Sequence, residues 1–160
     1  NHLFNIIISF FKEFSDKAMQ NEVMAQIFWD MERQKYFVYI PKQIVSGTRI
    51  SLERNSYMDS KYLLVLDIHS HNVMDAFFSS IDDADELETR LYAVVGNLGL
   101  KHKGIDPKIN IRASCKGKFI PLDINDITDG FDINKNVCFP KSWKEKIIFF
   151  NKEEGLWNTK

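Results

Sequence analysis

The order of apolar and polar residues predicts a mixture of helices and strands. Near the start of the chain, apolar side chains recur at the spacing of one helix face. This pattern favours an amphipathic helix over about residues 3–20, although the run 6–8 leaves a short strand as an alternative for its first part. The residues that carry the pattern are Leu3, Ile7, Phe10, Phe11, Phe14 and Ala18.

Shorter apolar runs bounded by turn residues are typical of β-strands. Two of them, 22–29 and 35–40, flank a charged turn and predict a hairpin. Further strands are expected at 48–52, 62–68 and 91–95, with a second hairpin at 108–113 and 118–122.

The remaining segments give weaker patterns. A helix rich in acidic residues is expected from Ser80 to about Thr89, since carboxylates favour a helix N-terminus. Residues 123–136 are rich in Asp and Asn and predict a loop, and 142–150 fits either helix or strand. Together these elements indicate an α/β or α+β fold with a mixed sheet.

Composition narrows the classes of partner and location. The chain has 160 residues, which suits one domain, and its 13 phenylalanines predict an aromatic-rich core. A net charge of −1 gives no electrostatic footprint for nucleic acid or a membrane surface, so neither is expected as a partner. No apolar run is long enough to span a bilayer, and no signal peptide is evident. Cys115 and Cys138 are interpreted as two buried free thiols in the cytoplasm, with one disulfide as the alternative.

The most informative motif follows the strand predicted at 62–68. It reads His69-Ser70-His71, then seven residues, Ser79, two residues and Asp82. Histidines two positions apart on a strand point to the same face. A carboxylate from the next element would add a third ligand, and three N and O ligands with an open fourth position are typical of catalytic zinc.

Some of these residues have structural interpretations as well. Ser79 and Asp82 also fit a helix capping box, in which each side chain binds the other's backbone. Asp83, Asp85 and Glu86 are expected to be surface charges of the same helix, with Asp83 as an alternative metal ligand. Ser79 is a candidate oxyanion donor in addition to its capping role.

A hydrolytic zinc site also needs a base for the attacking water, and Glu22 is the candidate. It is the first residue of an apolar strand, where burying a charge that has no partner costs free energy. Asp67 shares a strand face with His69 and is a candidate packing or orienting partner. Other carboxylates compete with Glu22 on composition alone: Asp30, Glu32, Glu53 and Asp67.

Taken together, Glu22, His69-Ser70-His71, Ser79 and Asp82 resemble the JAMM metalloprotease motif of the JAB/MPN domain family. The resemblance is strongest over 3–122, and it implies one domain over 1–160 in which 123–160 is a C-terminal extension. It implies an α/β fold with a mixed sheet flanked by helices, related in architecture to cytidine deaminases.

The same resemblance implies zinc (Zn2+) bound by His69, His71, Asp82 and a water. Glu22 would act as general base and then acid, and Ser79 as oxyanion donor. The chain departs from the family at Asn72, where Pro is frequent, and at Ala25, where Gly is common. Neither change removes a chemical group, so the chemistry survives.

The resulting hypothesis is a zinc-dependent hydrolase of peptide or isopeptide bonds, similar to prokaryotic stand-alone members. Its partner would be a protein or peptide substrate, of which a ubiquitin-like modifier is one candidate. The loop 72–78 either contacts substrate or is buried.

The alternative to a hydrolase is a non-catalytic scaffold. The aromatic N-terminal helix and the tail 143–157 offer apolar surface for a homodimer. Nucleobase deamination ranks low because the P-C-x-x-C motif is absent from the sequence.

Overall fold

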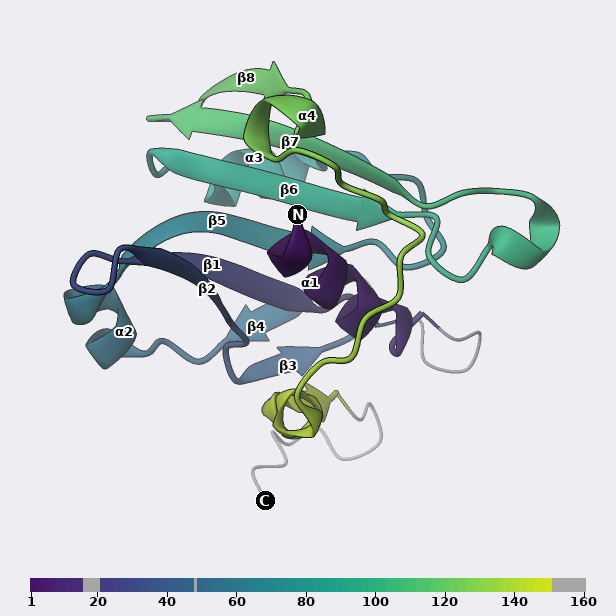
Figure 1. Cartoon of the computed structure of the whole chain (residues 1–160), viewed down its shortest axis with the longest axis horizontal. Coiled ribbons are helices and arrows are strands. Elements are labelled where there is room, and N and C mark those ends of the chain that lie inside the picture. The colour runs from purple at the N-terminus through teal and green to yellow at the C-terminus, as the bar shows by residue number, and fades with distance from the viewer. Residues whose placement is uncertain (16–20, 48, 151–160) are drawn as a thin grey trace.

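The computed structural model describes residues 1–15, 21–47 and 49–150 (Figure 1). The four α-helices in this part of the chain are α1 (His2–Lys12), α2 (Ser56–Lys61), α3 (Ser80–Asp85) and α4 (Ile124–Ile127). Two 3₁₀ helices are η1 (Lys101–Lys103) and η2 (Lys141–Lys146). The strands are β1 (Met24–Asp30), β2 (Lys35–Tyr39), β3 (Gln43–Val45), β4 (Ile50–Leu52), β5 (Leu63–Ser70), β6 (Arg90–Gly96), β7 (Lys108–Cys115), β8 (Lys118–Leu122) and β9 (Ile147–Phe149).

The strands form a mixed sheet, which confirms the predicted α/β fold class. Six of them pair in the order β2-β1-β5-β6-β7-β8. The β5–β6 pair is parallel, and the other neighbours in this sheet are antiparallel. A smaller sheet has the order β4-β3-β9, with β9 parallel to β3.

The two faces of the large sheet have different chemistry. Helix α1 lies across one face, where Ala25 of β1 stands opposite Ile68 of β5 and both are fully buried (Figure 1). The other face carries a row of polar and aromatic residues that are cross-strand neighbours: Gln26, Asp67, Tyr92 and Arg112. His69 lies two residues beyond Asp67 on this second face, so the sheet separates the core from the candidate chemistry.

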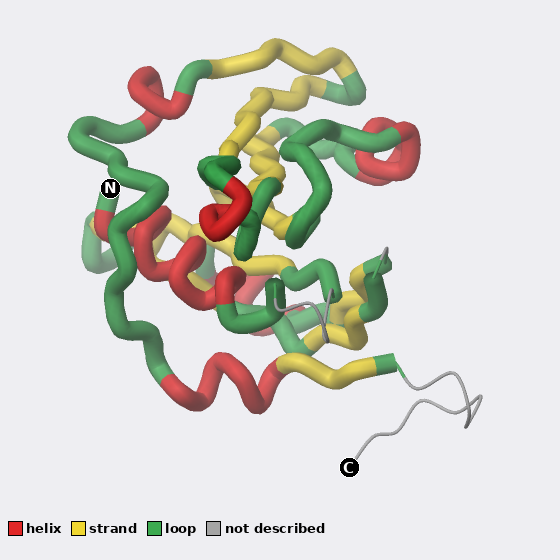
Figure 2. The backbone as a smooth tube through the Cα atoms, turned by 90° about the vertical axis from the view of Figure 1, so that its right-hand side faces the viewer, coloured by secondary structure: helices red, strands yellow, loops and turns green. Residues whose placement is uncertain are grey.

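The C-terminal segment covers the outer side of α1, as Figures 1 and 2 both show. Phe10 of α1 lies 5.4 Å from Phe139 and 5.5 Å from Trp143, measured between ring centroids. The amide of Val137 in the C-terminal segment donates a hydrogen bond to the hydroxyl of Ser9, a polar residue of α1. The helix is therefore buried on most sides, although its 3.6-residue pattern predicts one exposed face.

The expectation of apolar surface for a homodimer stays a prediction. Much of that surface on α1 packs instead against residues 131–143 of the same chain. The pattern of a single helix cannot report a covering segment more than 100 positions away in the sequence.

Several element boundaries differ from the predictions. Helix α1 ends at Lys12 rather than near residue 20, and residues 16–20 and 48 lie outside the described part. Helix α3 ends at Asp85 rather than near Thr89. The predicted loop 123–136 begins with α4, which Asp123 and Asp126 hold in a capping box. Residues 142–150 contain both alternatives, because η2 leads directly into β9.

The expected burial of Cys115 and Cys138 is wrong, because both free thiols are exposed. Cys115 ends β7 at the β7–β8 turn, where the strand leaves the core. Among the described residues, no helix is both long and apolar enough to cross a membrane.

The packing of α1 generates a prediction. Phe10 is fully buried between the sheet and the C-terminal segment. Phe10→Ala should lower the free energy of unfolding by about 3–5 kcal/mol, because it removes apolar contacts and leaves a cavity. Phe150→Ala, at a side chain that is 46% exposed, is the matched control and should change it by less than about 1 kcal/mol. Equal effects in urea unfolding would contradict the burial of α1.

Candidate metal centre

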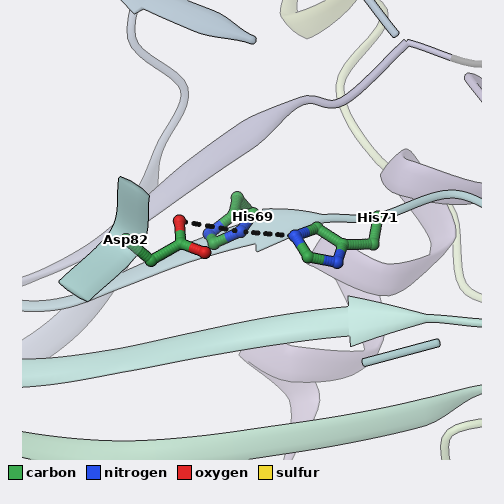
Figure 3. A group of neighbouring side chains, drawn as sticks. All are labelled: His69, His71 and Asp82. Atoms are coloured by element: carbon green, nitrogen blue, oxygen red, sulfur yellow. Dashed lines mark hydrogen bonds and ion pairs between the residues drawn. The ribbon is translucent and has the colours of Figure 1, made fainter. Parts of the chain in front are cut away.

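Two histidines meet where β5 ends on the second face of the sheet. His69 stands opposite Met24 of β1, and the amide of His71 donates to the carbonyl of Val95 at 2.8 Å. Both imidazoles are buried, and their Nε2 atoms lie 3.2 Å apart (Figure 3). The sequence predicts this shared face, and the structure shows the two rings converging on one point.

Asp82 reaches the histidines from the first turn of α3 (Figure 3). The amide and hydroxyl of Ser79 donate to its Oδ2 atom at 2.6 and 2.7 Å, and the amide of Asp82 donates to the Ser79 hydroxyl. Its other oxygen, Oδ1, lies 3.5 Å from Nε2 of His69. The capping box and the ligand hypothesis are therefore compatible, because each uses a different carboxylate oxygen.

The three side chains can together hold a metal ion. One donor atom from each of His69, His71 and Asp82 lies within 4.8 Å of the others. Four ligands arranged tetrahedrally at zinc–nitrogen bond lengths are about 3.3 Å apart, and the His–His and His–Asp separations of 3.2 and 3.5 Å are close to this value. The donor set of two imidazoles and one carboxylate is thus able to hold a metal ion.

The surroundings of both imidazoles favour the neutral form, which is the form that binds a metal. Burial lowers the pKa of His69 to about 4 and also lowers the pKa of His71. Nδ1 of His71 lies 3.3 Å from the carbonyl oxygen of Asp75. When this nitrogen donates to that carbonyl, the lone pair of Nε2 faces the other donors.

Glu22 lies two residues before the start of β1 and is buried beside the same group. Its Oε1 atom is 3.9 Å from Nε2 of His71. Burial, and then the nearby charge of Asp82, raise the pKa of Glu22 to about 7. A carboxyl group with such a pKa can both accept and release a proton near neutral pH.

The carboxylates that compete with Glu22 on composition lie elsewhere. Asp30 accepts hydrogen bonds from the amides of Glu32 and Arg33 at the far end of β1. Asp67 shares the face of His69 as expected, but its carboxylate binds Gln26 and Arg90. Glu32 is exposed, and so is Glu53, which pairs with Lys42.

Ser70 is a structural part of the site that the sequence motif contains without explaining. It is fully buried, and its hydroxyl accepts a hydrogen bond from the amide of Val23 at 3.1 Å. Its own amide donates to the carbonyl of Val23. Because Ser70 points away from the two histidines, it fixes the chain next to Glu22 while they face the candidate centre.

The loop 72–78 is partly buried and partly exposed. Asn72 and Ala76 are buried, whereas Met74 and Phe77 are exposed, and the Phe77 ring lies 4.8 Å from the His71 ring. The amides of Asn97 and Leu98 donate to carbonyls of this loop. The loop therefore has both a packed side and a side that is open to a ligand.

Two of the expected surface charges, Glu86 and Asp83, differ in burial. Glu86 is buried and paired with Arg112, rather than a surface charge. Asp83 is exposed, as expected of a surface charge, but it pairs with Arg112 on β7, which disfavours its alternative role as a metal ligand. Ser79 donates its hydroxyl proton to Asp82, so its role as an oxyanion donor stays a prediction that requires rotation of the side chain.

A cavity of about 550 Å³ opens on the same face of the sheet. It is lined in part by Met24, Asp67 and Asp85, which neighbour the candidate ligands on β1, β5 and α3. The cavity has the size of many ligand sites, but Glu22 and the three candidate ligands border it without lining it.

No protein-family model matches the sequence, and a search of curated proteins finds no match. The resemblance to the JAB/MPN family therefore remains an interpretation of the motif residues.

Gly96 provides a test of how the loop holds His71. A methyl group at Gly96 would overlap backbone atoms of Met74, Asp75 and Ala76. Gly96→Ala should displace the loop, lower stability by about 1–3 kcal/mol and shift the NMR signals of the His71 ring. Gly104→Ala is the control: its positive φ of 72° makes the substitution costly for the backbone, but the added methyl group meets no atom, so the His71 signals should stay in place. Unchanged His71 signals in Gly96→Ala would contradict this account.

The raised pKa of Glu22 predicts a pH dependence in metal-free protein. Its folded pKa of about 7 exceeds the ordinary value of 4.5. Its contribution to stability is therefore fully present below pH 4.5 and is lost as the pH rises through 7. A glutamine at this position has no proton to release. The free energy of unfolding of Glu22→Gln should therefore rise relative to that of wild type as the pH increases from 4.5 to above 7. Urea unfolding across this range, with Glu32→Gln as an exposed control, measures the difference; a constant difference would count against the assignment.

Proposed function

We propose that this protein is a zinc-dependent hydrolase of peptide or isopeptide bonds. The observation that carries the proposal is the convergence of His69, His71 and Asp82 beside the buried carboxyl group of Glu22. Three protein ligands with N and O donors leave a position for water or substrate, as in catalytic zinc sites. When bound, zinc lowers the pKa of a coordinated water and polarises a substrate carbonyl.

The proposed role of Glu22 is proton transfer. Its carboxylate is close to His71, and its pKa of about 7 matches a group that first accepts the proton of the attacking water. The same group then releases that proton to the leaving amine. The cleavage products would be a carboxylic acid and an amine, with water as the only other reactant.

The remaining residues supply positioning and space. In the proposed reaction, Ser79 rotates its hydroxyl from Asp82 toward the developing oxyanion, while its backbone amide keeps its bond to Oδ2 of Asp82. The exposed Phe77 ring forms one wall beside His71. The adjoining cavity of about 550 Å³ gives an extended peptide segment room along β1 and β5.

The test measures hydrolysis separately from metal binding. The zinc-loaded wild-type chain is incubated with two fluorogenic libraries, one of mixed-sequence peptides and one with amides on the lysine ε-amine. Wild type should cleave one of them, and Glu22→Gln should lose about 10²- to 10⁴-fold in rate while keeping its zinc. Glu32→Gln, far from the centre, should retain the wild-type rate.

Cleavage at the wild-type rate by Glu22→Gln would overturn the assigned role of Glu22. Zinc binding without cleavage of either library would contradict the hydrolase proposal and favour the scaffold alternative. The two libraries also distinguish a peptidase from an isopeptidase.

A further inference from the structure

Helix α3 carries the candidate ligand Asp82 but has little packing of its own. It has six residues, none of them buried, and Ile81 is 66% exposed. Isolated helices of this length are unstable in water, so a helix this short needs support from the rest of the fold. Its capping box closes the first turn but does not attach the helix to the sheet.

Two side chains of β7, Arg112 and Ser114, attach α3 to the sheet, and Arg112 makes most of these hydrogen bonds. The guanidinium of Arg112 contacts α3 at both the helix body and the helix end. Nη1 lies 2.5 Å from Oδ1 of Asp83, and Nη2 and Nε lie 2.6 and 2.9 Å from Oε2 of Glu86. The hydroxyl of Ser114, also on β7, donates to the backbone carbonyl of Glu86 at 2.8 Å.

Aromatic rings hold the guanidinium in place from both sides. Its central carbon lies 3.9 Å from the ring centre of Phe78 and 3.7 Å from that of Phe119. Phe78 directly precedes the N-cap Ser79, so this contact also fixes the entry into α3. A planar guanidinium is suited to stacking and to forked hydrogen bonds, and the Arg112 side chain is only 8% exposed.

The geometry of the helix connects this clamp to the metal centre. Asp83 and Glu86 are three residues apart and face the same way, toward β7. Asp82 is one position earlier and points instead toward His69. Holding Asp83 and Glu86 therefore sets both the rotation and the position of the carboxylate of Asp82.

We infer that Arg112 is a positioning residue that orients Asp82 for metal binding by clamping α3 onto β7. This inference rests on the proposed metal site, but the clamp itself exists without a metal. Arg112 touches neither the ligand atoms nor a substrate, and it acts through the placement of α3.

Electrostatics and positioning predict opposite results for the removal of Arg112. Arg112 is close enough for its positive charge to lower the pKa of His69. If charge alone mattered, Arg112→Met would tighten cation binding and Arg112→Lys would leave it unchanged. If the clamp matters, both variants bind zinc more weakly, because neither retains the fork that holds Asp83 and Glu86 together.

The experiment measures zinc affinity by competition with a chromophoric chelator in the full chain. We expect at least about tenfold weaker binding in Arg112→Met and Arg112→Lys, the range found for residues that orient metal ligands. Asp83→Asn is a milder variant at a side chain that is 54% exposed, and it should weaken binding in the same direction. Arg90→Met is the matched control. The ion pairs of Arg90 are with Asp67 and Glu88, and neither of these residues lies on α3. This variant should keep affinity within about threefold of wild type.

Amide hydrogen exchange in metal-free protein tests the clamp separately. Residues 80–86 should exchange at least about tenfold faster in the Arg112 variants, while β1 and β5 keep their protection. Unchanged exchange in α3, or unchanged or tighter zinc binding in folded Arg112→Lys, would overturn the inference. A wild-type chain that binds no zinc would instead overturn the proposed function, and the exchange result would still decide whether Arg112 holds α3.

Discussion

The alternating directions of side chains at the end of β5 determine where the other parts of the candidate site lie. Ser70 points toward the chain before β1 and holds Val23, which brings Glu22 beside the centre. His69 and His71 point the opposite way, into the space that α3 closes. A shift of one residue in this register would exchange these directions, and both histidines would then face the apolar core.

Burial of the side chains at the end of β5 and around α3 changes their pKa values. It lowers the pKa values of both histidines and raises those of Glu22 and Glu86 to about 7. Each of these shifts favours the neutral form, as expected for ionisable groups taken out of water. A divalent cation held by His69, His71 and Asp82 would add positive charge where buried acids gather. Arg112 supplies positive charge on the other side of α3, where it offsets Glu86 and Asp83.

The sequence predicts the local parts of this arrangement better than the long-range ones. The spacing of His69, His71, Ser79 and Asp82 depends on one strand end and one helix cap, and alternation and capping are local rules. Glu22 could be proposed because it borders an apolar strand. The clamp could not, because Arg112 lies 26 residues beyond Glu86 and its role depends on the β6–β7 pairing. The burial of the outer side of α1 is not predictable from local sequence for the same reason, since Phe139 and Trp143 cover it from far along the chain.

In the proposed site, Asp82 serves at once as a helix cap and as a metal ligand, using one oxygen for each role. The most direct measurement is elemental analysis of metal per chain after zinc is offered to protein purified without a histidine tag. We expect about one zinc per chain in wild type and in Ser79→Ala, which weakens the cap but keeps the carboxylate. Asp82→Ala should retain close to none. A wild-type chain without zinc, or an Asp82→Ala variant with the wild-type zinc content, would show that Asp82 does not bind zinc in this protein.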